Sequence, residues 1–309
     1  MAQMDIHDNT VIVTRPDNLT LIAFALTAVL GGANGVAIRF TVAEMPPFWG
    51  AAIRFAAAAL CFWAIMLGRR IPLPTGRPLV GVLLYGVLDI GASFAFVYWG
   101  IRNIQVSLAS VILALAPLMT FFFALAHGME LFRWRSLLGA ILALGGITLA
   151  FMGQPPTAVP LWSLLALIAG TACLAEATVV VKWFPTVHPV VTNALAMSTG
   201  TIMLILFSLL AGERWQLPAL LTTWAAILYL VFFGSVVVFY LFVFVARRWT
   251  ASATSYLFVL FPFVTVLLAV WLLTETVTWA FMLGGAVVLV GVWFGALAQS
   301  GSNAGLRGR

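Results

Sequence analysis

Apolar stretches of about 20 residues, separated by short polar turns, restrict the fold of this chain more than any other feature. About 20 apolar residues in a helix cross the hydrocarbon core of a bilayer, and a backbone in lipid has to satisfy its own hydrogen bonds. Each stretch is therefore predicted to be a transmembrane helix of an all-α membrane protein. The ten predicted spans are 19–40, 47–68, 78–101, 104–126, 134–153, 160–183, 189–211, 222–246, 251–272 and 278–298.

The scarcity of charge supports this assignment. Only 8% of the residues are charged, whereas a soluble domain carries about 25%, so the chain cannot cover a surface that faces water. The connections are too short to hold a soluble ATPase domain, and no GxxxxGK[ST] motif occurs. Cys61 and Cys173 both lie within apolar stretches and are interpreted as core residues. No metal or other cofactor is expected.

The net charge of +6 is explained by membrane topology, and no nucleic-acid partner is expected. Cytoplasmic loops of membrane proteins collect Lys and Arg. If the N-terminus is cytoplasmic, only Arg39, Arg102 and Arg214 lie outside and Arg54 lies within a span. Both termini are therefore predicted to be cytoplasmic, with tails at 1–18 and 299–309. The basic residues then placed inside are Arg15, Arg69, Arg70, Arg77, Arg133, Arg135, Lys182, Arg247, Arg248, Arg307 and Arg309.

An internal repeat divides the chain into two units, 19–153 and 154–298. A shift of 145 residues places 107–146 on 252–291 without a gap. A weaker match at a shift of 142 pairs Asn34 with Glu176. Each unit holds five spans, an odd number, so the second unit is predicted to enter the membrane from the opposite side. Inverted repeats of this kind generate inward-open and outward-open states. Identical pairs include Ser107/Ser252, Pro117/Pro262, Glu130/Glu275 and Trp134/Trp279.

Three charged residues lie within predicted spans, where a charge is costly and usually faces a cavity. Asp89 lies near the predicted midplane, Glu176 in the cytoplasmic half and Arg54 in the outer half. The acids are candidates for binding a substrate ammonium or for a protonation switch, and Arg54 for binding a carboxylate. The alternatives are structural pairing between helices and, for Arg54, snorkelling of its side chain toward the interface.

Aromatic residues flank Asp89 at helical spacing. Tyr85, Asp89, Phe96 and Trp99 are predicted to share one face of 78–101. An acid beside aromatic rings suits an organic cation or a zwitterion that carries a ring, because ring faces attract cations. An aromatic packing face is the alternative interpretation.

Five further residues complete the set of candidates. Asn34 and its repeat partner Glu176 are predicted to line a cavity at mirrored depths, and Tyr240 and Tyr256 are further lining candidates. Pro117 and Pro262 lie near the middle of equivalent spans, where a proline removes a hydrogen bond and bends a helix. They are predicted to be paired bending points for gating, with incidental packing as the alternative.

Local signatures resemble a known family. One is Ser107-Leu-Ala-Ser110 leading to Leu115-Ala-Pro117, with its echo from Ser252 to Pro262, and another is the segment from Pro46-Pro47 to Arg54. With the five-plus-five organisation, they resemble the EamA-type branch of the drug/metabolite transporter superfamily. Within it, the chain is most similar to aromatic amino acid exporters of bacterial inner membranes. The resemblance implies a central cavity lined by spans 1, 3, 4, 6, 8 and 9.

The expected function is secondary transport. The protein is predicted to export amino acids, aromatic ones preferred, across the bacterial inner membrane by alternating access, as a monomer in the lipid bilayer with small-molecule substrates. A broader drug exporter or a nucleotide-sugar or other metabolite carrier is the alternative. An intramembrane enzyme would need a nucleophile–base or metal constellation, and the sequence contains neither G-x-S-x-G nor HExxH. The protein is therefore not expected to be an enzyme.

Overall fold

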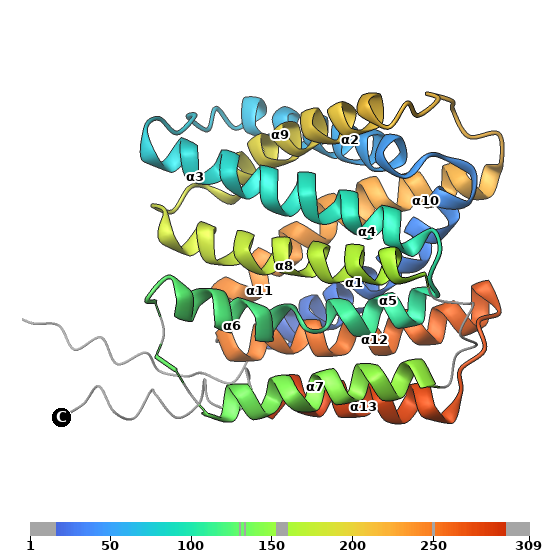
Figure 1. Ribbon diagram of the computed structural model, residues 1–309. Coiled ribbons are helices and arrows are strands. Elements are labelled where there is room, and N and C mark those ends of the chain that lie inside the picture. The colour runs from blue at the N-terminus through green and yellow to red at the C-terminus, as the bar shows by residue number, and fades with distance from the viewer. Residues whose placement is uncertain (1–16, 130, 133, 153–159, 249–250, 295–309) are drawn as a thin grey trace, which may run out of the picture.

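The computed structural model describes residues 17–129, 131–132, 134–152, 160–248 and 251–294, and all regular secondary structure in this part is helical (Figure 1). The chain begins with α1 (Asn18–Glu44) and α2 (Pro47–Gly68). The remaining elements are α3 (Arg77–Tyr85), η1 (Gly86–Ser93), α4 (Phe94–Ile101), α5 (Val106–Leu113), α6 (Ala116–Ala126), α7 (Trp134–Met152), α8 (Leu161–Trp183), α9 (Pro189–Leu210), α10 (Leu221–Val231), η3 (Phe232–Val237), α11 (Val238–Arg248), α12 (Ala251–Leu273) and α13 (Trp279–Val292).

The helices agree in length and composition with a protein that spans a membrane. Seven helices or continuous helical runs in the described part are long and apolar enough to cross a bilayer. Three shorter apolar helices, Trp134–Ala150, Leu260–Leu273 and Trp279–Val292, lie within the remaining predicted spans. The prediction of an all-α membrane protein is confirmed.

The predicted spans at 78–101, 104–126 and 222–246 are not uniform α-helices. The span at 78–101 consists of α3, the π-helix η1 and α4, and the span at 222–246 consists of α10, the π-helix η3 and α11. The span at 104–126 is interrupted between α5 and α6, and Pro117 lies in the first turn of α6. Proline fits a first turn because the N–H that it lacks has no partner there. Its repeat partner Pro262 lies inside the continuous helix α12.

The helices of the two halves pack in a pattern that is unchanged when the halves are exchanged. Helix α1 packs against α12 and against α10–α11, while α8 packs against α5–α6 and against η1–α4. The second helices of the halves, α2 and α9, pack against each other, and so do the last ones, α7 and α13. These two pairs form opposite faces of the bundle in Figure 1.

The first helices of the two halves run in opposite directions. Near the end of α1, Arg39 donates a hydrogen bond to the carbonyl oxygen of Ile101 at 2.7 Å. Close by in the chain, Asn103 donates to Ser163, in the first turn of α8, at 3.4 Å. The C-terminal end of α1 and the N-terminal end of α8 therefore lie at the same end of the bundle. The second half is inverted relative to the first, as the odd number of spans predicts.

Three glutamates at this end join one half to the other. The Glu44 carboxylate accepts from the backbone N–H of Leu220, just before α10, at 3.2 Å. The Glu213 carboxylate accepts from Phe48 N–H and Trp49 N–H, in the first turn of α2, at 3.1 and 2.8 Å. A carboxylate is favourable there because a helix N-terminus has unpaired N–H groups and a positive dipole end.

The third glutamate follows the same pattern. Glu275 accepts from Val106 N–H at 2.6 Å and from Ser107 N–H at 3.1 Å, at the start of α5. Its repeat partner Glu130 lies outside the described residues. In the sequence, Glu275 is only a mark of the repeat. In the structure, it joins the two halves through its hydrogen bonds at the start of α5.

Candidate functional site

The π-helices η1 and η3 occupy equivalent positions in the two halves. A shift of 145 residues places 86–93 on 231–238, and η3 spans Phe232–Val237. π-Helical turns are rare and frequently occur at functional sites. Both interrupt the middle of a membrane-spanning run. The polar groups beside η1 and η3 are therefore candidates for the functional site.

Arg54 of α2 contacts η3 with its guanidinium group. The side chain is 0% exposed. Its Nε donates to the Ser235 hydroxyl at 3.1 Å, and its Nη2 donates to the Gly234 carbonyl at 3.2 Å. Its Nη1 donates to the Tyr98 hydroxyl of α4 at 3.4 Å. The guanidinium is thus held by groups from both halves of the protein.

Aromatic rings complete the environment of this guanidinium. Its central carbon lies 4.7 Å from the ring centroid of Phe55 and 5.1 Å from that of Phe94, within the range of cation–π attraction. Within the described part of the chain, no carboxylate oxygen lies within 4.0 Å of an Arg54 nitrogen. Buried charges are usually paired with an opposite charge. Arg54 is therefore a buried cation whose described partners are all neutral.

Asn34 of α1 extends the same network. Its Nδ2 donates to the Gly234 carbonyl at 3.1 Å, and its Oδ1 is buried with no hydrogen-bond partner in the part of the chain that the structure describes. A side chain at Gly234 would overlap Asn34 Oδ1, so glycine is what allows α1 to approach η3 so closely. We call Asn34, Arg54, Tyr98, Gly234 and Ser235 the central polar cluster.

Asp89 lies in η1, the other π-helix. Its side chain is 3% exposed, and its Oδ1 has no hydrogen-bond partner among the described residues. Tyr85, one turn earlier, interacts with this carboxylate. The segment η1 packs against α8 and α9 of the second half. Asp89 is therefore a buried acid with one oxygen available to a donor.

The predicted aromatic face around Asp89 is not a single face in the structure. Phe96 is 41% exposed, whereas Asp89 is buried. The wider turns of η1 lie between them, so the α-helical spacing used for the prediction does not hold across the segment. Phe94 and Tyr98, which the prediction omitted, reach the central polar cluster instead. Trp99 is half-buried.

Glu176 of α8 lies in a different environment from its repeat partner Asn34. Its Oε1 lies 2.7 Å from Nε2 of His127, at the end of α6. Its Oε2 is buried and has no hydrogen-bond partner among the described residues. The Trp183 ring lies 4.9 Å from the His127 ring. His127 carries no candidate role in the sequence analysis, and its partner lies 49 residues away in the chain. A partner so far away in the chain leaves no signal in the local sequence.

Two further candidates are placed less informatively. The Tyr240 side chain is 63% exposed, so the bundle does not enclose it. The side chain of Tyr256 lies outside the described residues. In the described part of the chain, no group of three or more His, Cys, Asp or Glu side chains could hold a metal ion.

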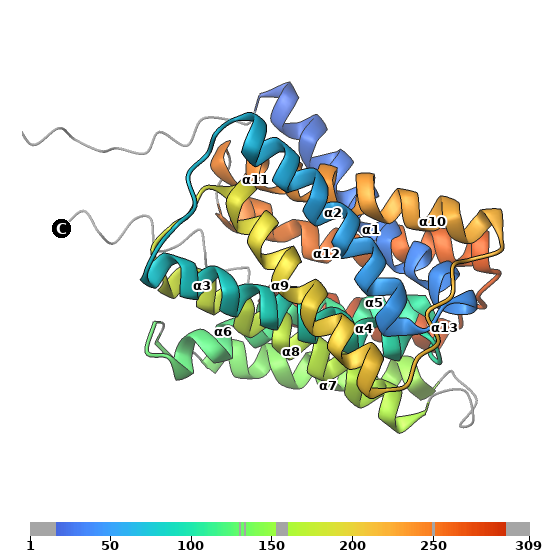
Figure 2. The same ribbon diagram turned by 90° about the horizontal axis from the view of Figure 1, so that it is seen from above.

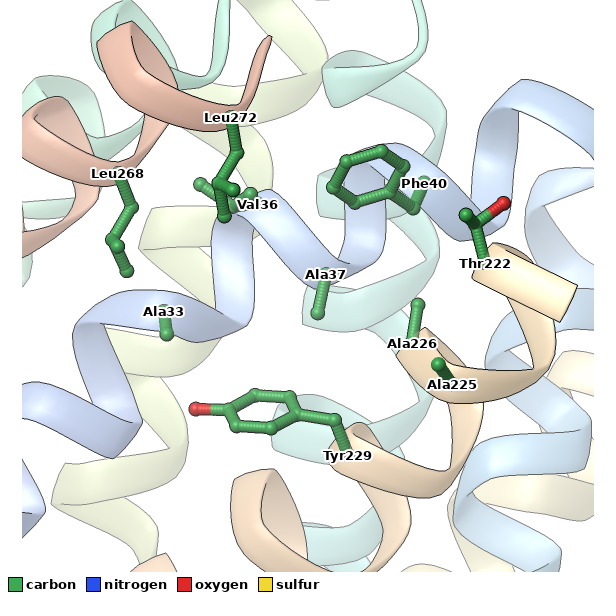
Figure 3. Close-up of a pocket in the computed structure, with 10 residues that line it drawn as sticks. All are labelled: Ala33, Val36, Ala37, Phe40, Thr222, Ala225, Ala226, Tyr229, Leu268 and Leu272. Atoms are coloured by element: carbon green, nitrogen blue, oxygen red, sulfur yellow. The ribbon is translucent and has the colours of Figure 1, made fainter.

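A cavity of about 320 Å³ lies between α1, α10 and α12 (Figure 3). In Figure 3 the Tyr229 ring lies along one side of it, with Leu268 and Leu272 on the other. The Tyr229 hydroxyl donates to the Leu30 carbonyl at 2.6 Å. The same residue interacts electrostatically with Arg54, so the cavity and the central polar cluster are neighbours. The other lining residues are Ala33, Val36, Ala37, Phe40, Thr222, Ala225 and Ala226.

Comparisons with known proteins agree with this architecture. The model of the EamA-like transporter family matches residues 18–152 and again 161–296. The chain is 30% identical to the uncharacterized inner membrane transporter YedA of Escherichia coli K12 over 257 residues, which cover 82% of this chain and 83% of the relative. It is 25% identical to an uncharacterized transporter of Archaeoglobus fulgidus, with 88% and 96% covered.

A solved crystal structure has the same fold, with a TM-score of 0.66 and 18% identity, and covers 91% of this chain and 97% of its own. The family match accounts for both halves of the chain, and the names of the relatives indicate transport without a substrate. The protein is a membrane transporter that crosses the inner membrane several times, and it belongs to the EamA-like transporter family.

Proposed function

We propose that the protein exports amino acids, with aromatic ones preferred, across the bacterial inner membrane. The two inverted halves, with ten spans and both termini in the cytoplasm, expose a central site alternately to each side. The positive-inside distribution of Lys and Arg then places the end with Glu44, Glu213 and Glu275 in the periplasm. A single copy of the chain is the transporting unit.

Asp89 is the observation that carries this proposal. A carboxylate buried within a membrane-spanning run is costly unless it has a role there, and one of its oxygens has no partner in the described residues. A substrate ammonium group is a suitable partner, because it is positively charged and donates three hydrogen bonds. Tyr85, Asn34 and Glu176 remain part of the proposal, because their side chains are at least half-buried in the bundle.

A broader exporter of drugs or metabolites is the second candidate. The cavity beside α1 has a mostly apolar lining, which also suits an organic cation without a carboxylate. The two candidates predict different substrates. An amino acid exporter exchanges phenylalanine and tryptophan, and a broad exporter exchanges organic cations at least as well.

Counterflow in proteoliposomes tests the proposal. Purified protein is reconstituted, and exchange of labelled phenylalanine and tryptophan is compared with exchange of other amino acids and organic cations. We expect Asp89→Asn to raise the KM for phenylalanine by about tenfold to a hundredfold, the range for a lost hydrogen bond to a charged group. Asp17→Asn is the matched control, because it removes a carboxylate at the N-cap of α1. If neither aromatic amino acid exchanges, the proposed preference is wrong.

A further inference from the structure

We infer that Arg54 is the anchor for a carboxylate group of the transported substrate. The inference rests on the proposed function and adds a requirement to it. Ammonium recognition alone would admit simple amines, whereas a carboxylate anchor favours substrates that carry an acid group. The chemical class is then a carboxylate joined to an aromatic or other apolar side chain.

Within the described residues, the positive charge of Arg54 is not paired with a negative charge. A guanidinium cannot lose its proton in a protein, so this buried side chain remains a cation. Its described partners are a carbonyl, two hydroxyls and two aromatic rings, all of them neutral. Removal of an ion from water costs several kcal/mol in a protein interior. An anionic ligand at this position would supply the missing opposite charge.

Arg54 also has N–H donors that are not used. Its hydrogen bonds within the described residues use three nitrogens, and a guanidinium has five N–H donors. Two donors are thus left for a further acceptor within the described part of the structure. The planar fork of arginine matches the two oxygens of a carboxylate. The hydroxyl groups of Ser235 and Tyr98 hold this fork in a defined orientation.

The cavity between α1, α10 and α12 could hold the rest of such a substrate. Its volume of about 320 Å³ lies within the usual range of about 300–1,000 Å³ for small-molecule pockets. Its lining is mostly Ala, Val, Leu and aromatic side chains (Figure 3). Tyr229 lines the cavity and interacts electrostatically with Arg54. A substrate with a ring in the cavity and its carboxylate toward Arg54 would satisfy both surroundings.

The position of Arg54 also links such an anchor to transport. Arg54 belongs to the first half, while Gly234 and Ser235 belong to the second. A carboxylate that takes up the guanidinium would compete with the Gly234 carbonyl for its N–H groups. Substrate binding would therefore weaken a contact between the halves, and their relative movement is what alternating access requires.

The test compares L-phenylalanine with L-phenylalaninol, which keeps the ring and the amine but lacks the carboxylate. Both are used as competitors of labelled phenylalanine exchange in proteoliposomes. We expect phenylalaninol to compete at least about tenfold more weakly with the unaltered protein, since a hydrogen bond to a charged group is lost. In Arg54→Gln this difference should disappear, and in Arg54→Lys it should be reduced. Arg39→Gln, which alters an α1 arginine that donates to backbone carbonyls at the end of α4, should keep the full difference.

A second measurement tests the anchor even if Arg54→Gln does not fold or if the protein does not transport amino acids. Thermal unfolding of the detergent-solubilised protein is followed with 3-phenylpropionate, a carboxylate without an amine. We expect it to raise the melting temperature of the unaltered protein and of Arg39→Gln, and to have less effect on Ser235→Ala and Tyr98→Phe, which retain Arg54. Such stabilisation without any exchange of phenylalanine would support the anchor and contradict the export of amino acids.

The opposite results overturn the inference. One is exchange of phenylalanine with equal competition by phenylalaninol in the unaltered protein. The other is a difference between the two competitors that persists in Arg54→Gln or, if that variant does not fold, in Arg54→Lys at its full size. Either result would leave amino acid export intact and assign Arg54 a packing role between α2 and η3.

Discussion

The π-helices η1 and η3 share a position and a set of neighbours but differ in chemistry. Segment η1 packs against α8 and α9, the first two helices of the second half, and η3 packs against α1 and α2, the first two helices of the first half. Yet η1 carries the acid Asp89, whereas η3 presents a carbonyl and a hydroxyl to Arg54. The duplication has kept the backbone arrangement and changed the groups that it holds.

The same difference is visible in the helices that these segments meet. A shift of 142 residues places Arg54 on Ala196. Arg54 extends its guanidinium to η3, while Ala196 lies so close to η1 that a Cβ on Gly86 would be 2.7 Å from its backbone. One contact is polar and held by side chains, and the other is backbone against backbone. In the proposed transport cycle the halves would exchange shapes, and a bound substrate would meet different chemistry on each side.

The largest expected effect is on the backbone contact. In Gly86→Ala the added Cβ would lie 2.7 Å from Cα and O of Ala196, and two helix backbones would have to separate. Overpacking of this kind costs about 1–3 kcal/mol, and we expect the upper part of that range in the free energy of unfolding in detergent. Gly145→Ala is the control, because no heavy atom of a neighbouring described residue lies within 4 Å of a Cβ added at Gly145. Equal effects of the two changes would show that the η1–α9 contact is not tight.

A smaller effect is expected at the equivalent contact of η3. In Gly234→Ala the three atoms nearest the new Cβ all belong to the side chain of Asn34, which can rotate away if it gives up its hydrogen bond to Gly234. The loss of one hydrogen bond costs about 0.5–1.5 kcal/mol. In an Asn34→Ala background the same change should cost less, as a double-mutant cycle of unfolding free energies would measure. Strict additivity of the two changes would contradict this contact.

The smallest expected effect has the opposite sign. Thr201 of α9 follows Gly200, which contacts η1. The Thr201 hydroxyl is buried and has no hydrogen-bond partner in the described part of the chain. Thr201→Val keeps the shape and removes an unpaired polar group, so we expect stabilisation by up to about 1 kcal/mol. Ser235→Ala is the counterpart beside η3. Because its hydroxyl accepts a hydrogen bond from Arg54, we expect it to destabilise the protein. Unfolding free energies with the same sign would remove the contrast between the two sides.

The sequence identified the charged residues of interest but not their surroundings. Asp89 and Arg54 were both recognised because charges are rare in apolar spans. The partners of Arg54 on η3 are about 180 residues away in the chain, with separations of 181 and 180. Nothing in the local sequence around Arg54 indicates them. Phe96 is 41% exposed whereas Asp89 is buried, and the π-helical turns of η1 between them are not encoded in the α-helical spacing used to predict the aromatic face.

The sequence by itself determined the membrane environment, the helical class and the doubling of the chain. Each of these follows from short-range properties, namely hydrophobic length, the scarcity of charge and self-similarity at a fixed shift. Only the tertiary structure decided where the helices change to π-helices, which glutamates join the halves and which groups surround Arg54. Those features depend on contacts between helices far apart in the chain, where the free energy of packing and of hydrogen bonding outweighs local preference.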